Sequence, residues 1–184
     1  MSHRILIVLI AFIVLAGCKE EVFPKPKAML RLDFPKTEYG KLDTKNYVFE
    51  MNKIAKVKIQ NENAMTIDYP TIKGSIYITY KKVGEDLNTL LRDSQKLSYE
   101  HAAKADNIIE QPFVNPPKEV YGMFYEVTGN AASQSQFYVT DSINHFVTGS
   151  LYFYAKPNYD SIYPATNYLQ KDIRRIMESM EWKD

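Results

Sequence analysis

The sequence predicts an α+β fold, in which an antiparallel sheet of about six strands has a helix on each face. Residues 47–83 and 119–155 alternate between apolar and polar side chains with a period of two, which is typical of strands. Residues 85–109 and the C-terminal region instead place apolar side chains at helical spacing. Along the chain, strands are followed by a long helix, further strands and a last helix. An antiparallel sheet on which both helices pack accommodates this order.

The segment 47–83 predicts three or four antiparallel strands. Val57 and Ile59 face one way and Lys56 and Lys58 the other, as on a half-buried strand. The intervening stretches "NEN" and "PTIKG" contain residues that favour turns.

The next segment, 85–109, predicts the first long helix. Gly84 and the acidic pair Glu85-Asp86 mark its start, where negative charge suits the helix dipole. The stretch "QPFVNPPKE" follows, and its three prolines predict a stiff loop. The positions expected on the apolar side of this helix are Leu87, Leu90, Leu91, Ser94, Leu97 and His101.

Strands return between residues 119 and 155. In "EVYGMFYEVTG" the side chains of Tyr121, Met123 and Tyr125 share one face. Two further strands are expected on either side of a turn at Asp141-Ser142. The second of these has apolar residues on both faces, which indicates a central strand covered on both sides.

The chain ends in a helix, whose first turn suits Pro164. Its short tail, "SMEW", is similar to the end of the PsbP-like α/β/α sandwich, and the fold resembles that sandwich in its order of elements. Such a resemblance implies a fold and no activity. The buried stripe expected on this helix consists of Leu169, Ile173, Ile176, Met177 and Met180.

The N-terminus has the features of a bacterial lipoprotein signal. The apolar run "ILIVLIAFIVLAG" is too short for a membrane-spanning helix and suits the hydrophobic region of a signal peptide. The stretch Leu15-Ala16-Gly17-Cys18 resembles a lipobox, which implies cleavage before Cys18 and acylation of this cysteine. The alternative, an uncleaved anchor helix, would draw the charges of "KEE" into the bilayer.

Three regions follow from this assignment. Residues 1–17 are expected to be the signal peptide, residues 18–36 a lipidated, proline-rich tether, and residues 37–184 a single globular domain. Two or more acyl chains give stable anchoring, so the mature protein is expected to be tethered to a membrane rather than to span it. The expected place of this anchor is the bacterial outer membrane. The "KEE" after Cys18 is either a solvated spacer or, by resemblance to some envelope lipoproteins, a surface-export signal. Both a periplasm-facing and a surface-exposed location therefore remain open.

Composition restricts the function further. The chain has 23 Lys and Arg against 22 Asp and Glu, and removal of the signal peptide takes away Arg4, which leaves a formally neutral protein. Such a protein has no general attraction for nucleic acid. Cys18 is the only cysteine, so core packing must hold the fold without disulfides. The 14 tyrosines suit a half-buried sheet and also permit an aromatic recognition surface.

The whole chain resembles the gliding-motility lipoprotein D family (GldD). The resemblance rests on the lipobox, on "PKPKAMLRLDFP" and "RDSQKLSYEHAAKADNI", and on the final helix. Ala28 stands where the family pattern would have a glycine. The resemblance implies an envelope lipoprotein needed for gliding and linked to the type IX secretion apparatus. It supplies no catalytic residues.

The residues themselves give little support for catalysis or metal binding. His101 and His145 are far apart, and no cysteine ligand remains once Cys18 is acylated. His101 is expected at the edge of the core and His145 at the surface. "DSINH" brings Asp141, Ser142 and His145 together in sequence, but a polar hairpin turn explains the same residues. We expect no enzymatic activity, no cofactor beyond the lipid on Cys18, and no metal.

Binding is the remaining class of function. The leading hypothesis is a non-enzymatic scaffold that holds other gliding or secretion proteins at the envelope through protein–protein contacts. The candidate contact residues are Pro24, Pro26, Leu30 and Arg31, although the sequence favours a solvated or edge-strand arginine as the explanation of Arg31. The alternative is a lipoprotein that binds a small ligand between sheet and helix.

Overall fold

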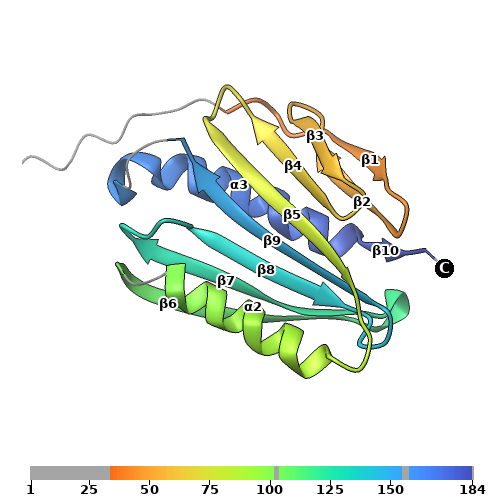
Figure 1. The fold of residues 1–184 in the computed structure, drawn as a ribbon. Coiled ribbons are helices and arrows are strands. Elements are labelled where there is room, and N and C mark those ends of the chain that lie inside the picture. Colours follow the sequence, from red (N-terminus) through yellow and green to blue (C-terminus); the bar gives the residue numbers. More distant parts are fainter. Residues whose placement is uncertain (1–33, 102–103, 155–157, 184) are drawn as a thin grey trace, which may run out of the picture.

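The computed structural model describes residues 34–101, 104–154 and 158–183. In these ranges it is an α+β structure with two helices, a large antiparallel sheet and a small one (Figure 1). The helices are α2 (Leu87–His101) and α3 (Tyr159–Ser179). The small sheet has the order β1 (Tyr39–Asp43), β2 (Tyr47–Asn52) and β10 (Glu181–Trp182).

The large sheet has seven strands rather than the six or so expected. Its spatial order is β3 (Lys56–Asn61), β4 (Ala64–Tyr69), β5 (Gly74–Lys82), β9 (His145–Phe153), β8 (Ser135–Thr140), β7 (Val120–Gly129) and β6 (Ala105–Asn115). All neighbouring pairs are antiparallel. The strand predicted to be central, β9, is the middle one of the seven.

The segment 47–83, predicted to form three or four strands, forms four, but they divide between the two sheets. β3, β4 and β5 form a meander at one side of the large sheet, whereas β2 pairs with β1 and β10. Tyr47 and Phe49 of β2 are buried in the main core, so the small sheet packs against the same cluster of side chains as the large one.

The main core lies between α3 and the sheets. The predicted stripe of α3 is buried throughout, from Leu169 to Met180. It shares one apolar cluster with Ile76, Ile78 and Val147 of the central strands. Burying side chains of this size contributes about 1.5–3 kcal/mol each, so this cluster is the main source of stability in the fold.

A second, smaller cluster of apolar side chains attaches α2 to the large sheet. Leu90 packs with Val83 and Phe146, and Asp86, just before the helix, accepts a hydrogen bond from the backbone amide of Gly84 through its side chain. Phe146 and Val147 are neighbours on β9 and point to opposite sides of the strand. Phe146 thus belongs to the cluster that contains Leu90 of α2, and Val147 to the main core.

The helix predicted over 85–109 ends earlier, at His101, and residues 105–115 form β6 instead of the end of a helix and a loop. Ile108 and Ile109 are β-branched, which favours a strand, and β6 pairs with β7 along its whole length. Pro112 is tolerated because β6 is an edge strand with one unpaired row of backbone groups. Pro116–Lys118, the rest of the expected loop, is a short 3-10 helix.

Candidate functional site

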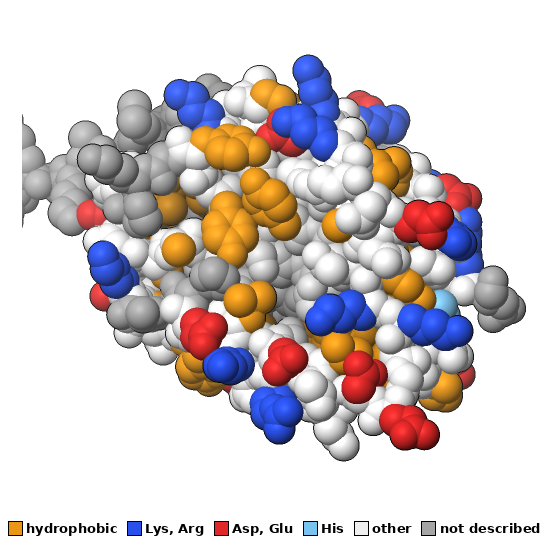
Figure 2. Space-filling model, in the orientation of Figure 1, with side chains coloured by type: hydrophobic (Ala, Val, Ile, Leu, Met, Phe, Trp, Pro, Cys, Tyr) orange, Lys and Arg blue, Asp and Glu red, His pale blue; other side chains and the backbone are white. Residues whose placement is uncertain are grey.

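A shallow groove of about 520 Å³ lies over β5 and β9, beside α2. Figure 2 shows orange side chains gathered over these two strands, with blue and red ones mostly around them. We call this surface the tyrosine groove. Its lining side chains are Tyr77, Thr79, Leu97, Thr148, Ser150, Tyr152 and Tyr154.

The pleat of the sheet produces the groove. Ile76 and Ile78 of β5 point into the main core, so Tyr77 and its same-face neighbours point away from it. Across the strands Tyr77 pairs with Ser150, and Thr79 pairs with Thr148. The two adjacent strands therefore present two consecutive cross-strand pairs on one face, which together contain one tyrosine ring and three aliphatic hydroxyl groups.

The tyrosine rings form a partly open platform. Tyr77 and Tyr152 pack edge to face with ring centroids 5.5 Å apart. Tyr77 is 40% exposed and Tyr154 is 55% exposed, so parts of both rings are available to a ligand. Burial and the neighbouring Tyr154 raise the pKa of Tyr77, and its phenol therefore stays neutral at physiological pH.

A buried carboxylate closes one end of the groove. Asp68 of β4 accepts hydrogen bonds from the Ser75 hydroxyl at 2.9 Å and from the Tyr154 hydroxyl at 3.3 Å. Its other oxygen accepts one from the Lys58 ammonium at 2.7 Å. The hydrogen bond from Lys58 holds the pKa of Asp68 below its ordinary value. Asp68 is therefore ionised at neutral pH, and Lys58 compensates its charge.

A second site lies on α3, where the end of the expected tether contacts the domain. The Phe34 ring stacks on Tyr168 with centroids 4.7 Å apart. The Tyr168 hydroxyl donates a hydrogen bond to the Pro35 carbonyl at 3.2 Å. We call these three residues the tether seat. They attach residues 34 and 35 to α3.

Hydrogen bonds with buried polar groups hold Tyr168 of the tether seat in place. The Asn52 side-chain amide donates to the Tyr168 hydroxyl and to Asp172, at 3.0 Å in each case. Asp172 also accepts a hydrogen bond from the Tyr39 hydroxyl at 3.0 Å. Burial raises the pKa of Asp172, and these hydrogen bonds offset part of that effect. The position of Tyr168 is thus tied to a buried carboxylate of the same helix.

The segment Asp141–His145 is a hairpin loop, as the turn interpretation predicts. One oxygen of Asp141 accepts hydrogen bonds from the backbone amides of Ile143, Asn144 and His145 at 2.8–2.9 Å. Ser142 has a positive φ of 69°, which is typical of a tight turn. The carboxylate of Asp141 is therefore used to hold its own loop.

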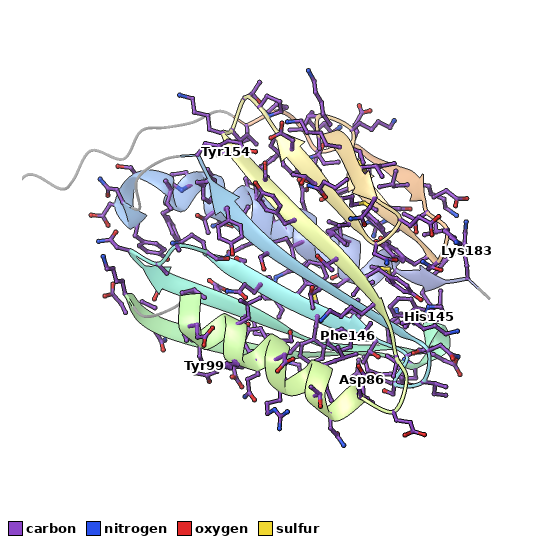
Figure 3. All side chains as sticks on the ribbon, in the orientation of Figure 1. Asp86, Tyr99, His145, Phe146, Tyr154 and Lys183 are labelled. Carbon is purple, nitrogen blue, oxygen red and sulfur yellow. The ribbon has the colours of Figure 1, made fainter. Side chains whose placement is uncertain are left out.

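The prediction that His145 is exposed is wrong. Its ring stacks on Trp182 with centroids 5.1 Å apart, and its Nδ1 lies 3.0 Å from the Tyr80 hydroxyl. Trp182 comes from β10, which pairs with β2, and this pairing brings the indole over the histidine. Figure 3 shows His145 and Tyr154 at opposite ends of β9, so the histidine lies away from the closed end of the groove.

The predicted site residues Cys18, Pro24, Pro26, Leu30 and Arg31 lie outside the described residues. His101 ends α2, and its side chain is likewise outside the described part. Within the described ranges, no three His, Cys, Asp or Glu side chains come close enough together to hold a metal ion. In the same ranges, neither helix is long and apolar enough to cross a bilayer.

Sequence reasoning anticipated a tyrosine surface but not this groove. The signal was the alternation itself, because Tyr77 and Thr79 on one strand, and every second residue from Thr148 to Tyr154 on the other, are aromatic or carry a hydroxyl. The tether seat gave no local signal, since Phe34 and Tyr168 are far apart in the sequence.

Comparison with known proteins agrees with the resemblance noted in the sequence. The model of the family described as gliding motility lipoprotein GldD matches residues 19–182. No curated protein matches the chain.

Proposed function

Because the chain belongs to the gliding motility lipoprotein GldD family, we propose that it supports gliding as a scaffold of the bacterial envelope. In this role it holds proteins of the gliding and type IX secretion machinery together through direct contacts and performs no catalysis. The family match over nearly the whole chain is the observation that carries this proposal.

The proposed anchor is a covalent lipid on Cys18, a palmitate among its acyl chains. Residues 1–17 are removed, residues 18–36 form the tether, and residues 37–184 form the globular domain at the outer membrane. Phe34 and Pro35, near the C-terminal end of this tether, rest on α3 of the domain. The sequence "KEE" leaves both a periplasm-facing and a surface-exposed domain possible.

The proposed partner contacts are Pro24, Pro26, Leu30 and Arg31 of the tether. They precede Phe34 of the tether seat by three to ten residues, so a protein bound to them would be joined to the α3 side of the domain by a short stretch of chain. Tryptophan, tyrosine and arginine side chains supply most of the binding energy in typical protein interfaces, which favours Arg31 among these four residues. The neutral charge of the mature chain gives no general attraction for nucleic acid as a competing partner.

The arrangement of layers also supports a binding module. We infer that the large sheet, with α2 on one face and α3 on the other, forms a PsbP-like α/β/α sandwich. The contacts of Leu90 with Phe146, and of α3 with the Val147 cluster, support this inference. A fold of this kind gives no activity by itself.

Binding of a small ligand is the second candidate function. The tyrosine groove favours it, because its volume of about 520 Å³ falls within the range of about 300–1,000 Å³ that is usual for ligand pockets. This alternative does not exclude the scaffold, because the tether contacts and the groove involve different residues.

Crosslinking in gliding cells tests the scaffold. We expect wild-type protein to crosslink to envelope proteins of the gliding or secretion machinery, and Arg31→Glu to lose these crosslinks and slow the cells. Lys27→Glu is the matched control, since it reverses a charge in the same tether, and it should keep both. If the wild-type protein repeatedly crosslinks to no other protein, the scaffold function is wrong.

A further inference from the structure

We propose that the tyrosine groove binds an uncharged carbohydrate, with pyranose rings lying on Tyr77 and Tyr154 between α2 and the Asp68 end of the groove. This inference goes beyond the scaffold function and does not depend on it. It rests on four features: the charge of the groove, its exposed rings, its unpaired hydroxyls and the strands beneath it.

The charge of the groove suits a neutral ligand. Its lining consists of tyrosine, threonine, serine and leucine side chains and includes no acid or base. The carboxylate at its end, Asp68, is already neutralised by Lys58 at 2.7 Å. An anionic or cationic ligand would find no counter-charge in this lining and would lose part of its hydration on entering.

The exposed rings suit the apolar faces of sugars. An aromatic ring is electron-rich over its face, so it attracts the weakly positive C–H groups on one side of a pyranose ring. Tyr77 and Tyr154 each leave about half of their surface open, and Leu97 of α2, also exposed, adds an apolar side wall. The edge-to-face contact with Tyr152 holds the ring of Tyr77 in place before a ligand arrives.

The hydroxyls suit the polar edges of sugars. Within the part of the chain that the structure describes, the side chains of Thr79, Thr148 and Ser150 have no hydrogen-bond partner. Each hydroxyl can donate one hydrogen bond and accept others, which matches the mixed donor and acceptor character of sugar hydroxyls. Thr148 and Ser150 lie two residues apart on β9, about 7 Å along the strand, so the set extends beyond a single sugar ring.

The strands beneath the groove argue against an added peptide strand. Peptides commonly bind a sheet by pairing with a free edge. β5 is paired with β4 and β9, and β9 with β5 and β8, so neither floor strand has a free edge. A purely apolar ligand such as an acyl chain would leave the three hydroxyls unpaired, which is unfavourable once water is displaced.

Calorimetric titration of the full lipidated protein tests the proposal. The protein should be kept in a detergent without a sugar headgroup, because such a headgroup would compete for the groove. The probes are chitotetraose, cellotetraose and maltotetraose. We expect saturable binding of at least one of them with a Kd of about 1 mM or tighter.

Three variants locate the site. Tyr77→Ala should weaken binding about tenfold by removing the stacking surface. Thr148→Val should weaken it about threefold by removing one hydrogen bond while keeping the shape. Tyr99→Ala is the control, because this tyrosine of α2 is 50% exposed but does not line the groove, and it should bind as the wild type does. Thermal unfolding checks that all three variants are folded.

Three outcomes would overturn the proposal. The first is that none of the probes binds at about 10 mM, where a millimolar site would be largely filled. The second is that Tyr77→Ala and Tyr99→Ala bind the sugar equally well. The third is that a photoreactive group at position 77 captures an envelope protein and sugar does not compete with it, because the groove would then be a protein-docking surface.

Discussion

Asp68 and Asp172 are buried carboxylates whose pKa values shift in opposite directions. The ammonium of Lys58 lowers the pKa of Asp68, whereas burial raises that of Asp172. Asp68 therefore stabilises the fold above its ordinary pKa, and this stabilisation is lost as the pH falls through its lowered value. The contribution of Asp172 is complete below its ordinary pKa and is lost as the pH rises through its raised value.

This opposition predicts how two asparagine variants respond to pH. As the pH rises from about 3 to 7, Asp172→Asn should gain stability relative to the wild type, because the wild type must then keep a carboxylate ionised in the core. Asp68→Asn should lose stability relative to the wild type over the acidic part of the same range. Urea unfolding at a series of pH values measures both differences, and curves parallel to that of the wild type would contradict the assignment.

At the level of single residues, the sequence predicted the contacts that a residue makes with its neighbours in the chain. It did not predict the contacts that a residue makes with distant segments. The Asp141 turn was predicted because its hydrogen bonds are all to the next few amides. The partial burial of His145 was missed because its cover, Trp182, comes from the other end of the domain. The tether residues from Cys18 to Arg31 stay predictions.

At the level of elements, the spacing of apolar residues correctly distinguished helix from strand wherever one pattern continued without interruption. The stripe of α3 follows directly from its spacing. The cover expected on both faces of β9 is only partial, because Thr148, Ser150 and Tyr152 line the open tyrosine groove. The end of α2 was misplaced because residues 102–109 contain no proline or glycine that would have signalled a break. α3 also begins earlier than expected, at Tyr159, so Pro164 lies inside the helix rather than in its first turn.

The contact between β8 and β9 depends on a glycine. A Cβ at Gly149 would lie 2.1 Å from the ring of Phe137, so Gly149→Ala must displace a fully buried aromatic side chain. We expect a loss of about 1–3 kcal/mol in the free energy of unfolding. Gly40→Ala is the control, since its Cβ would make only ordinary contacts at 3.6 Å, and it should change stability by less than about 0.5 kcal/mol.

Denaturant unfolding measures both variants. The double variant Gly149→Ala/Phe137→Leu should recover part of the loss, because the smaller side chain leaves room for the new methyl group. If Gly149→Ala is as stable as Gly40→Ala, the packing of these two strands is not as described.

At the level of the whole molecule, the fold class could be predicted and the division into two sheets could not. Alternation identifies strands but does not say which strands pair, and β2 was not expected to leave the strands that follow it. The tyrosine groove depends on the pairing of β5 with β9, which are far apart in the sequence. The order of strands, and hence the groove, required the three-dimensional structure.

The proposed anchor gives a prediction for the whole molecule. Cys18→Ser removes the acceptor for lipid, so the variant should leave the membrane fraction and the cells should lose gliding. Fractionation followed by immunoblotting, together with cell tracking, measures the two effects. Ala28→Gly, a change in the same tether that keeps the thiol, should behave as the wild type. A Cys18→Ser protein that stays with the membrane and sustains gliding would contradict lipid anchoring.

The pairing of β10 with β2 has a consequence for how the protein is made. The small sheet joins residues 47–48 to residues 181–182, and the core needs α3 packed beneath it. The fold therefore cannot be completed while the ribosome has yet to synthesise residue 182. Until then the complete fold cannot hinder the threading of the polypeptide through a translocation channel.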